Sequence, residues 1–169
     1  MIFMNNVILI GMPGVGKSTL GVILAKLLGL RFTDTDLIIQ EKCGELLKNI
    51  IASEGIDGFI ERENRICCGV NVSNTVIATG GSVIYGNEAM EHFRNIGTVV
   101  YLKQEFDIID KRLSDIKGRG VILRDGQTLR ELFDERSPLY EKYAHLTVPM
   151  TENGTIEDNI ELVLKALGK

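Results

Sequence analysis

Residues 11–18 read Gly-Met-Pro-Gly-Val-Gly-Lys-Ser and match the pattern G-x-x-x-x-G-K-S/T at every fixed position. The five residues before them, Asn6–Ile10, form a short apolar run that predicts a buried parallel strand. Apolar side chains at helical spacing over residues 17–28, followed by Gly29, predict a helix after the motif. The motif therefore stands between a strand and a helix, and we interpret it as a phosphate-binding loop rather than a glycine-rich turn that matches by chance.

The residue types in this loop suit a nucleotide triphosphate. Glycines let the backbone turn so that successive N–H groups converge on phosphate oxygens, and the helix N-terminus adds partial positive charge. Lys17 can reach the β- and γ-phosphates, while the Ser18 hydroxyl can ligate Mg²⁺. The predicted ATP-binding residues of the loop are Gly11, Pro13, Gly14, Val15, Gly16, Lys17, Ser18 and Thr19.

Strand and helix patterns alternate along the rest of the chain. Short apolar runs predict strands at 31–33, 75–78, 98–102 and 146–148, and helical patterns cover 37–43, 45–53, 58–68, 87–95, 106–113, 128–143 and 156–167. This alternation predicts a single α/β domain over residues 1–169, with a five-stranded parallel sheet in a three-layer α/β/α architecture. Between residues 114 and 126 the periodicity fails and basic residues stand among glycines, which predicts a mobile basic lid.

Composition narrows the class of protein. The 169 residues carry a net charge of −4 and no basic run interleaved with aromatics, so a nucleic-acid partner is not expected. The apolar run at the amino terminus is too short to span a membrane and lacks a basic leader. Cys43, Cys67 and Cys68 form no C-x-x-C pair and are interpreted as reduced side chains. We therefore expect a soluble cytoplasmic protein.

The motif alone does not choose the phosphate acceptor, but the rest of the chain limits it. No guanine-reading N-K-x-D element occurs, and the chain is short for a motor ATPase, which leaves the small kinases. The run Val76–Ala78 ends in glycines rather than in the usual acid, so an acid near the metal must come from elsewhere. Asp34 and Asp36 follow the second predicted strand and can serve a metal and an acceptor hydroxyl. Taken alone, an Asp before Leu37 is equally well explained as a helix N-cap.

The combination of motifs resembles the shikimate kinase family from Asn6 to about Lys142. The matching positions are Gly11 to Ser18, Asp34 and Asp36 after the second strand, Gly80 and Gly81 after the third, Arg119 in the predicted lid, and Arg136-Ser137-Pro138-Leu139-Tyr140. The resemblance implies a P-loop kinase fold, ATP as co-substrate with Mg²⁺, and a monomer.

The resemblance also implies roles for individual residues. Asp34 would support the metal through water, and Asp36 would bind acceptor hydroxyls and help to take the proton of the attacking one. Gly80, beside Gly81, would offer its N–H to the substrate, and Arg136 would bind the substrate carboxylate. Arg119 would stabilise the transferring phosphoryl group. Arg112 would stack on adenine.

The chain departs from the family pattern mainly on the acceptor side. Ile60 stands where the family has a second carboxylate-binding arginine, and Ser82 replaces the third glycine of the triplet. In the predicted lid, Gly120 replaces a proline. Glu63 lacks the arginine that would precede it by one helical turn, so we hypothesise that it pairs with Arg136 or faces a cationic acceptor group.

Three functions remain open from the sequence. The first is phosphorylation of shikimate to shikimate 3-phosphate by ATP. The second is phosphorylation of a different hydroxylated small molecule by a kinase of the same fold. The third is a nucleotide-dependent regulatory module without transfer chemistry, against which the full transfer set argues; a nucleoside monophosphate kinase would need a base-reading pocket and more lid arginines.

Overall fold

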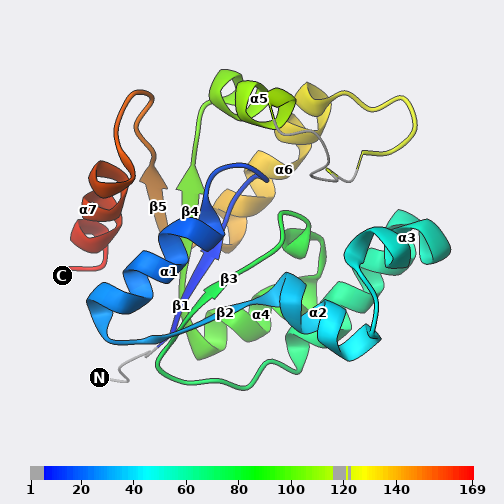
Figure 1. The fold of residues 1–169 in the computed structure, drawn as a ribbon, viewed down its shortest axis with the longest axis horizontal. Helices are drawn as coiled ribbons and strands as arrows, with labels where there is room; N and C mark the ends of the chain where they lie inside the picture. The colour runs from blue at the N-terminus through cyan, green and yellow to red at the C-terminus, as the bar shows by residue number, and fades with distance from the viewer. Residues whose placement is uncertain (1–5, 116–120, 122) are drawn as a thin grey trace.

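A computed structural model of the chain describes residues 6–115, 121 and 123–169. Its centre is a five-stranded, entirely parallel sheet with the strand order β2-β3-β1-β4-β5 (Figure 1). The strands are β1 (Asn6–Ile10), β2 (Arg31–Asp34), β3 (Thr75–Ala78), β4 (Gly97–Lys103) and β5 (Leu146–Pro149). The predicted parallel sheet is confirmed.

Burial along the strands follows their place in the sheet. Every residue of β1 and β3 is buried, because both strands have a neighbour on each side and helices on each face. The edge strands β2 and β5 are more exposed. Continuous apolar sequence such as Val7–Ile10 is what a strand covered on both faces requires, and this pattern made the central strands recognisable.

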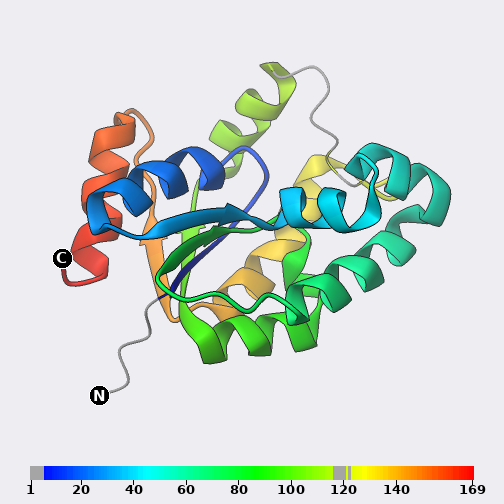
Figure 2. The same ribbon diagram turned by 60° about the horizontal axis from the view of Figure 1, so that its bottom comes forward.

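Helices cover both faces of the sheet, as Figures 1 and 2 show. On one face, α1 (Lys17–Leu28) packs on β2 and β3 beside α7 (Ile156–Ala166), which packs on β5. On the other face, α4 (Asn87–Ile96) and α6 (Leu129–Tyr143) pack on β4. In Figure 2, α1 and α4 lie on opposite sides of the strands. This arrangement confirms the three-layer α/β/α fold.

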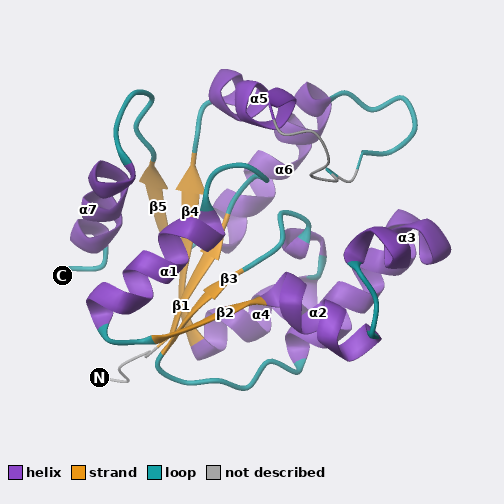
Figure 3. Ribbon diagram, viewed as in Figure 1, coloured by secondary structure: helices purple, strands orange, loops and turns teal. Residues whose placement is uncertain are grey.

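The remaining helices pack mainly against other helices. Helix α2 (Thr35–Cys43) packs against the long α3 (Leu47–Cys68) around a separate small core of Ile39, Ile50 and Phe59 (Figure 3). Helix α5 (Phe106–Asp115) packs against α6. The two helices predicted at 45–53 and 58–68 are the two halves of α3, which is interrupted at Gly55 by a non-helical φ of 73° and ψ of 178°.

Two features differ from the sequence prediction, and the predicted lid stays a prediction. Helix α2 begins at Thr35 rather than at residue 37, because Asp34 caps it. A short 3₁₀ helix, η1 (Val83–Tyr85), follows the glycines after β3 and was not expected. Much of the predicted lid at 114–126, including Arg119, lies outside the described residues. Within the described part of the chain, no helix is both long and apolar enough to span a membrane.

Candidate active site

The phosphate loop connects the end of β1 to the start of α1, as the motif predicted. Gly16 has a φ of 101° immediately before the helix, a conformation that a residue with a side chain rarely adopts. Gly11 has a φ of 150°, and a Cβ there would lie 2.8 Å from the Leu102 carbonyl oxygen. The sequence therefore supplies glycine where the loop needs it, and the N–H groups at the start of α1 form an anion site.

Lys17 lies over the loop that precedes it. Its side chain is buried, and its Nζ donates hydrogen bonds to the carbonyl oxygens of Gly11 at 2.7 Å and Met12 at 2.9 Å. These contacts hold an ammonium group beside the converging amides of the loop. A lysine in this place can neutralise charge on phosphate oxygens.

A hydrogen bond between Ser18 and Asp34 joins the start of α1 to the end of β2. The Ser18 hydroxyl donates to Asp34 Oδ2 at 2.7 Å, while Asp34 Oδ1 accepts the N–H of Asp36 at 2.9 Å. The helix cap is thus Asp34, not the residue directly before Leu37. Capping occupies one carboxylate oxygen and leaves the other beside the Ser18 hydroxyl. Two hard oxygen ligands that close together suit Mg²⁺, which usually takes one or two protein ligands besides phosphates and water.

Asp36 lies in the first turn of α2 and lines the same cleft as Lys17. Burial, followed by repulsion from Asp34, raises the pKa of Asp36 to about 6, although attraction to Lys17 works in the opposite direction. A carboxylate whose pKa lies near neutrality is well matched to accept a proton from a hydroxyl.

Two glycines after β3 bring the backbone against both halves of the cleft. A Cβ on Gly80 would lie 2.8 Å from Asp36 Oδ1 and also 2.8 Å from Glu63 Oε1. A Cβ on Gly81 would lie 2.8 Å from Pro13 and 3.0 Å from Arg136 Nη1. A side chain at either position would have to displace these site residues, so glycine lets the backbone lie this close to them. The Gly80 N–H, expected to meet substrate, donates here to Thr35 Oγ1 at 3.3 Å.

Ser82, the departure from the glycine triplet, has a partner. Its hydroxyl donates to Glu63 Oε2 at 2.6 Å, and both side chains are buried. Among the described residues, Glu63 Oε1 has no hydrogen-bond partner and no ion pair joins Glu63 to Arg136. The hypothesis of a Glu63–Arg136 pair is therefore wrong for this structure. Burial, opposed by the Ser82 hydrogen bond, raises the pKa of Glu63 to about 7.

The raised pKa of Glu63 makes stability depend on pH. The native carboxyl holds its proton more tightly than the unfolded one, so the free energy of unfolding falls as pH rises from about 4.5 through about 7. We expect Glu63→Gln to remove this fall and to raise the free energy of unfolding at pH 8 by on the order of 3 kcal/mol. Urea unfolding of the parent and the variant at pH 5 and pH 8 measures both changes in the free energy of unfolding. The exposed Glu61→Gln on the same helix is the control, and an equal pH dependence in both variants would contradict the assignment.

Arg136 brings a buried positive charge into the cleft. Its residue exposure is 2%, and among the described residues no carboxylate lies within ion-pair distance of it. Its Nε donates to the Tyr85 hydroxyl at 3.4 Å, and its guanidinium lies 5.4 Å from the centre of that ring. Attraction to Glu63 acts on this charge only beyond ion-pair distance, and a buried cation without a close partner is costly unless a ligand neutralises it. The arrangement therefore suits an anionic group on the ligand.

These residues border one cleft of about 570 Å³ at the carboxyl ends of the strands. Its described lining includes Pro13, Gly14, Gly16, Lys17, Ser18, Thr19, Asp36, Gln40, Phe59, Gly80, Gly81, Ser82 and Arg136. Gln40 and Phe59 were not predicted as site residues: Phe59 matches the family pattern but had no role, and a polar helix residue such as Gln40 carries no distinguishing signal. Tyr140 was recognised as part of the motif that begins at Arg136 but was given no role; its hydroxyl donates to the Gly81 carbonyl oxygen at 2.6 Å. Its spacing of four residues from Arg136 places both on one helix face, a signal that was available.

Three other predicted site residues lie in different places. Arg112 Nη1 donates to the Gly14 carbonyl oxygen at 3.1 Å, so this arginine contacts the phosphate loop. Ile60 is not among the described residues that line the main cleft, but it lines a small adjoining cavity that Arg136 shares. Arg119 lies outside the described residues.

The fold and site together define a class. A parallel sheet with a phosphate loop after β1, opposite a pocket that holds a carboxylate and a buried arginine, is the arrangement of a small-molecule P-loop kinase. Comparison with known protein families identifies the family within this class. The family model described as shikimate kinase matches residues 13–167, and the chain belongs to the shikimate kinase family.

Individual relatives agree with this assignment. A shikimate kinase from Clostridium botulinum (strain Alaska E43 / Type E3) is 36% identical over 96% of this chain and 97% of its own length. The structure of shikimate kinase from Acinetobacter baumannii in complex with shikimate has a TM-score of 0.84 and 34% identity, covering 96% of this chain and 92% of that one. A gluconokinase from Sinorhizobium meliloti 1021, at 16% identity and a TM-score of 0.61 over 98% of this chain and 93% of that one, shares the fold alone.

Proposed function

We propose that this protein transfers the γ-phosphoryl group of ATP to the 3-hydroxyl of shikimate, releasing ADP and shikimate 3-phosphate. The observation that carries the proposal is that Lys17, Asp36 and the buried Arg136 line one cleft. This cleft combines a site for phosphates, a proton acceptor and a cation for a carboxylate. Shikimate has hydroxyls and one carboxylate, which is the combination that these groups fit.

The phosphate side of the cleft binds ATP. Loop amides and Lys17 would hold the β- and γ-phosphates, and Arg112 would lie near the nucleotide because it contacts the loop. Ser18 and Asp34 are the residues proposed to hold Mg²⁺, directly and through water. When bound, this ion supplies charge neutralisation between the phosphates. The family resemblance alone supports Arg119 as the residue that stabilises the transferring phosphoryl group.

The acceptor side orients one hydroxyl for attack. The hydroxyl oxygen forms a bond to the γ-phosphorus while the bond from phosphorus to the bridging oxygen breaks, and ADP leaves. Asp36, in its ionised form, accepts the hydroxyl proton. Gly80, Gly81 and Ser82 form the backbone wall beside the substrate, and Ile60 contributes only through the adjoining cavity. Positioning within a closed cleft supplies much of the rate.

Substitution of Arg136 tests whether this residue binds the carboxylate of shikimate. We expect Arg136→Met to raise the KM for shikimate about 100-fold, because a charge-assisted contact in a buried site is lost. The KM for ATP should stay within about twofold, because the phosphate loop is untouched. Arg130→Met, an exposed position on the same helix, is the control. An unchanged KM for shikimate in Arg136→Met would contradict the carboxylate role.

Product analysis tests the reaction itself. The protein is incubated with Mg·ATP and shikimate, and the products are followed by ³¹P NMR and mass spectrometry. We expect ADP and one phosphate monoester of shikimate in equal amounts. Inorganic phosphate without a phosphorylated shikimate, or phosphorylation only of another hydroxylated metabolite in a mixed panel, would contradict the proposal.

We also propose that residues 1–169 act as one monomeric catalytic unit in the cytoplasm. All the described site residues come from one sheet and its covering helices, which supports a single unit. The three cysteines are all free, which is usual in a reducing compartment. Light scattering measures the mass in solution, and a dimer at assay concentration would argue against the monomer.

A further inference from the structure

A second, smaller cavity adjoins the main cleft and contains two arginines. It is lined by Ile56, Ile60, Tyr85, Arg124, Gln127, Leu132 and Arg136. Arg136 also borders the main cleft, so this residue is shared by the two spaces. Ile60, where the family pattern would place an arginine, contributes only apolar surface. The second positive charge at this place comes instead from Arg124, 64 residues later in the chain.

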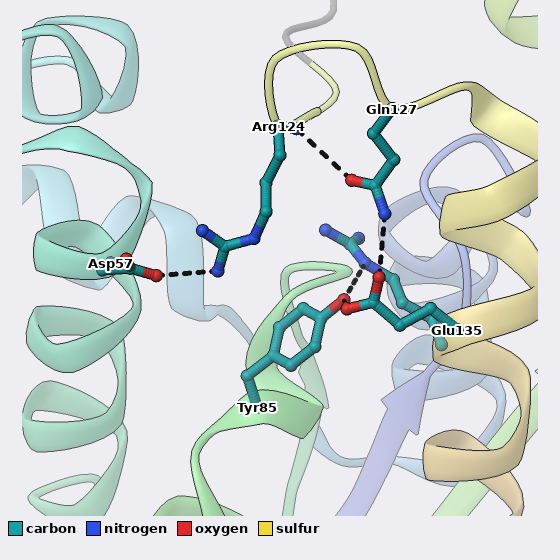
Figure 4. Close-up of polar contacts among 6 residues, drawn as sticks. Asp57, Tyr85, Arg124, Gln127 and Glu135 are labelled. Atoms are coloured by element: carbon teal, nitrogen blue, oxygen red, sulfur yellow. Dashed lines mark hydrogen bonds and ion pairs between the residues drawn. The ribbon is translucent and has the colours of Figure 1, made fainter.

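The backbone that carries Arg124 is tied to the elements around Arg136 (Figure 4). The Arg124 N–H donates to Gln127 Oε1 at 3.3 Å, and Gln127 Nε2 donates to Glu135 Oε2 at 2.8 Å. Tyr85 donates its hydroxyl hydrogen to the other oxygen of Glu135 at 2.8 Å. Tyr85 also accepts from Arg136. These contacts fix the base of the Arg124 side chain close to the pocket of Arg136.

Within the described part of the chain, the guanidinium of Arg124 has one hydrogen-bonded partner, the exposed Asp57. Its Nη2 lies 2.7 Å from Asp57 Oδ1, but the two side chains are 53% and 80% exposed. An ion pair this exposed contributes little to stability, because water solvates both charges and screens their attraction. The Arg124 guanidinium can therefore leave Asp57 at small cost when a better-placed anion is available.

We infer that Arg124 is the second carboxylate-binding residue of the acceptor pocket, and that its guanidinium exchanges Asp57 for a carboxylate already held by Arg136. The inference rests on the proposed function, since it assumes that the acceptor carries a carboxylate. Two guanidinium groups can satisfy both oxygens of that group from different sides. Ile60 would leave room for the longer side chain to approach, and Arg124 would decide specificity for anionic acceptors.

The test compares three variants in steady-state kinetics with Mg·ATP and shikimate. Arg124→Met keeps an unbranched side chain but removes the guanidinium and its charge, and we expect it to raise the KM for shikimate about 10-fold with kcat and the KM for ATP nearly unchanged. Asp57→Asn frees Arg124 without removing it, so its KM for shikimate should be equal to or lower than that of the parent. Arg130→Met, which removes an equally exposed arginine with a carboxylate partner, should change nothing.

An acceptor without a carboxylate tests whether Arg124 acts through that group. With the methyl ester of shikimate, which carries no negative charge, the parent and Arg124→Met should have the same KM. The inference is overturned if Arg124→Met leaves the KM for shikimate unchanged, or if Asp57→Asn raises it as much as Arg124→Met does, because the ion pair would then matter only for structure. Absence of turnover with shikimate in the parent protein would instead contradict the proposed function, so the two failures are distinguishable.

Discussion

Replacing Lys17 by alanine is expected to lower kcat by about 10³-fold or more while the protein remains folded. The ammonium group lies over the phosphate loop, where charge on the transferring group must be stabilised. No other described lysine or arginine side chain donates to the Gly11 or Met12 carbonyl oxygen, so no neighbour is placed to substitute directly. Measuring ADP release at saturating shikimate and ATP gives kcat.

The control for Lys17 lies on the same helix. Lys26 is exposed in the last turn of α1, and Lys26→Ala removes the same charge far from the loop. We expect this variant to keep the parent kcat and both variants to unfold within a few degrees of the parent protein. A rate near that of the parent in Lys17→Ala would contradict the role of the loop lysine.

Asp36→Asn is expected to produce the second large effect, a fall in kcat of about 10²- to 10⁴-fold. The amide keeps the shape of the carboxyl group but cannot accept the proton of the attacking hydroxyl. Because burial and Asp34 both disfavour the ionised form of Asp36, removing the charge should leave thermal stability at pH 8 equal or higher. We therefore expect kcat to fall without any loss of thermal stability.

This combination separates a chemical role from a structural one. If Asp36→Asn lost activity together with stability, the loss would be explained by misfolding. Asp134→Asn, an exposed carboxylate on α6, serves as the control and should alter neither quantity. Retained activity in Asp36→Asn would show that another group accepts the proton.

Much of the fold was predictable because strand burial and helix spacing follow local sequence. The run before the loop, Asn6–Ile10, and the helix after it, residues 17–28, have the predicted bounds. The break in α3 at Gly55 was predicted too, because the helical patterns at 45–53 and 58–68 leave a gap between them. The short η1 was not predicted, because it has too few residues to show a helical period.

The candidate site was predictable to the extent that motifs mark it. The loop and Asp36 follow the carboxyl ends of β1 and β2, and Arg136 reaches the same cleft from helix α6. The environment of each group was not predictable in the same way. Burial of Arg136 and the hydrogen bond from Ser82 to Glu63 depend on how helices pack, and a single sequence does not encode such distances explicitly.

The contact between Arg124 and Asp57 illustrates the limit most clearly. These residues are 67 positions apart and belong to a loop and a helix that meet only in the folded protein. The sequence shows that Ile60 stands where the family has an arginine, and that the segment around Arg124 is basic. Nothing in the sequence indicates that these two positions lie close together. The shared cavity in the folded structure supplies that connection.

Release of ADP with Mg·ATP, in the presence and absence of shikimate, tests the central claim most directly. The account predicts saturable turnover with shikimate, a low rate without any acceptor, and no comparable turnover with other hydroxylated metabolites. ADP release at the same rate with and without shikimate, or dependence only on a different acceptor, would contradict the claim that this cleft phosphorylates shikimate.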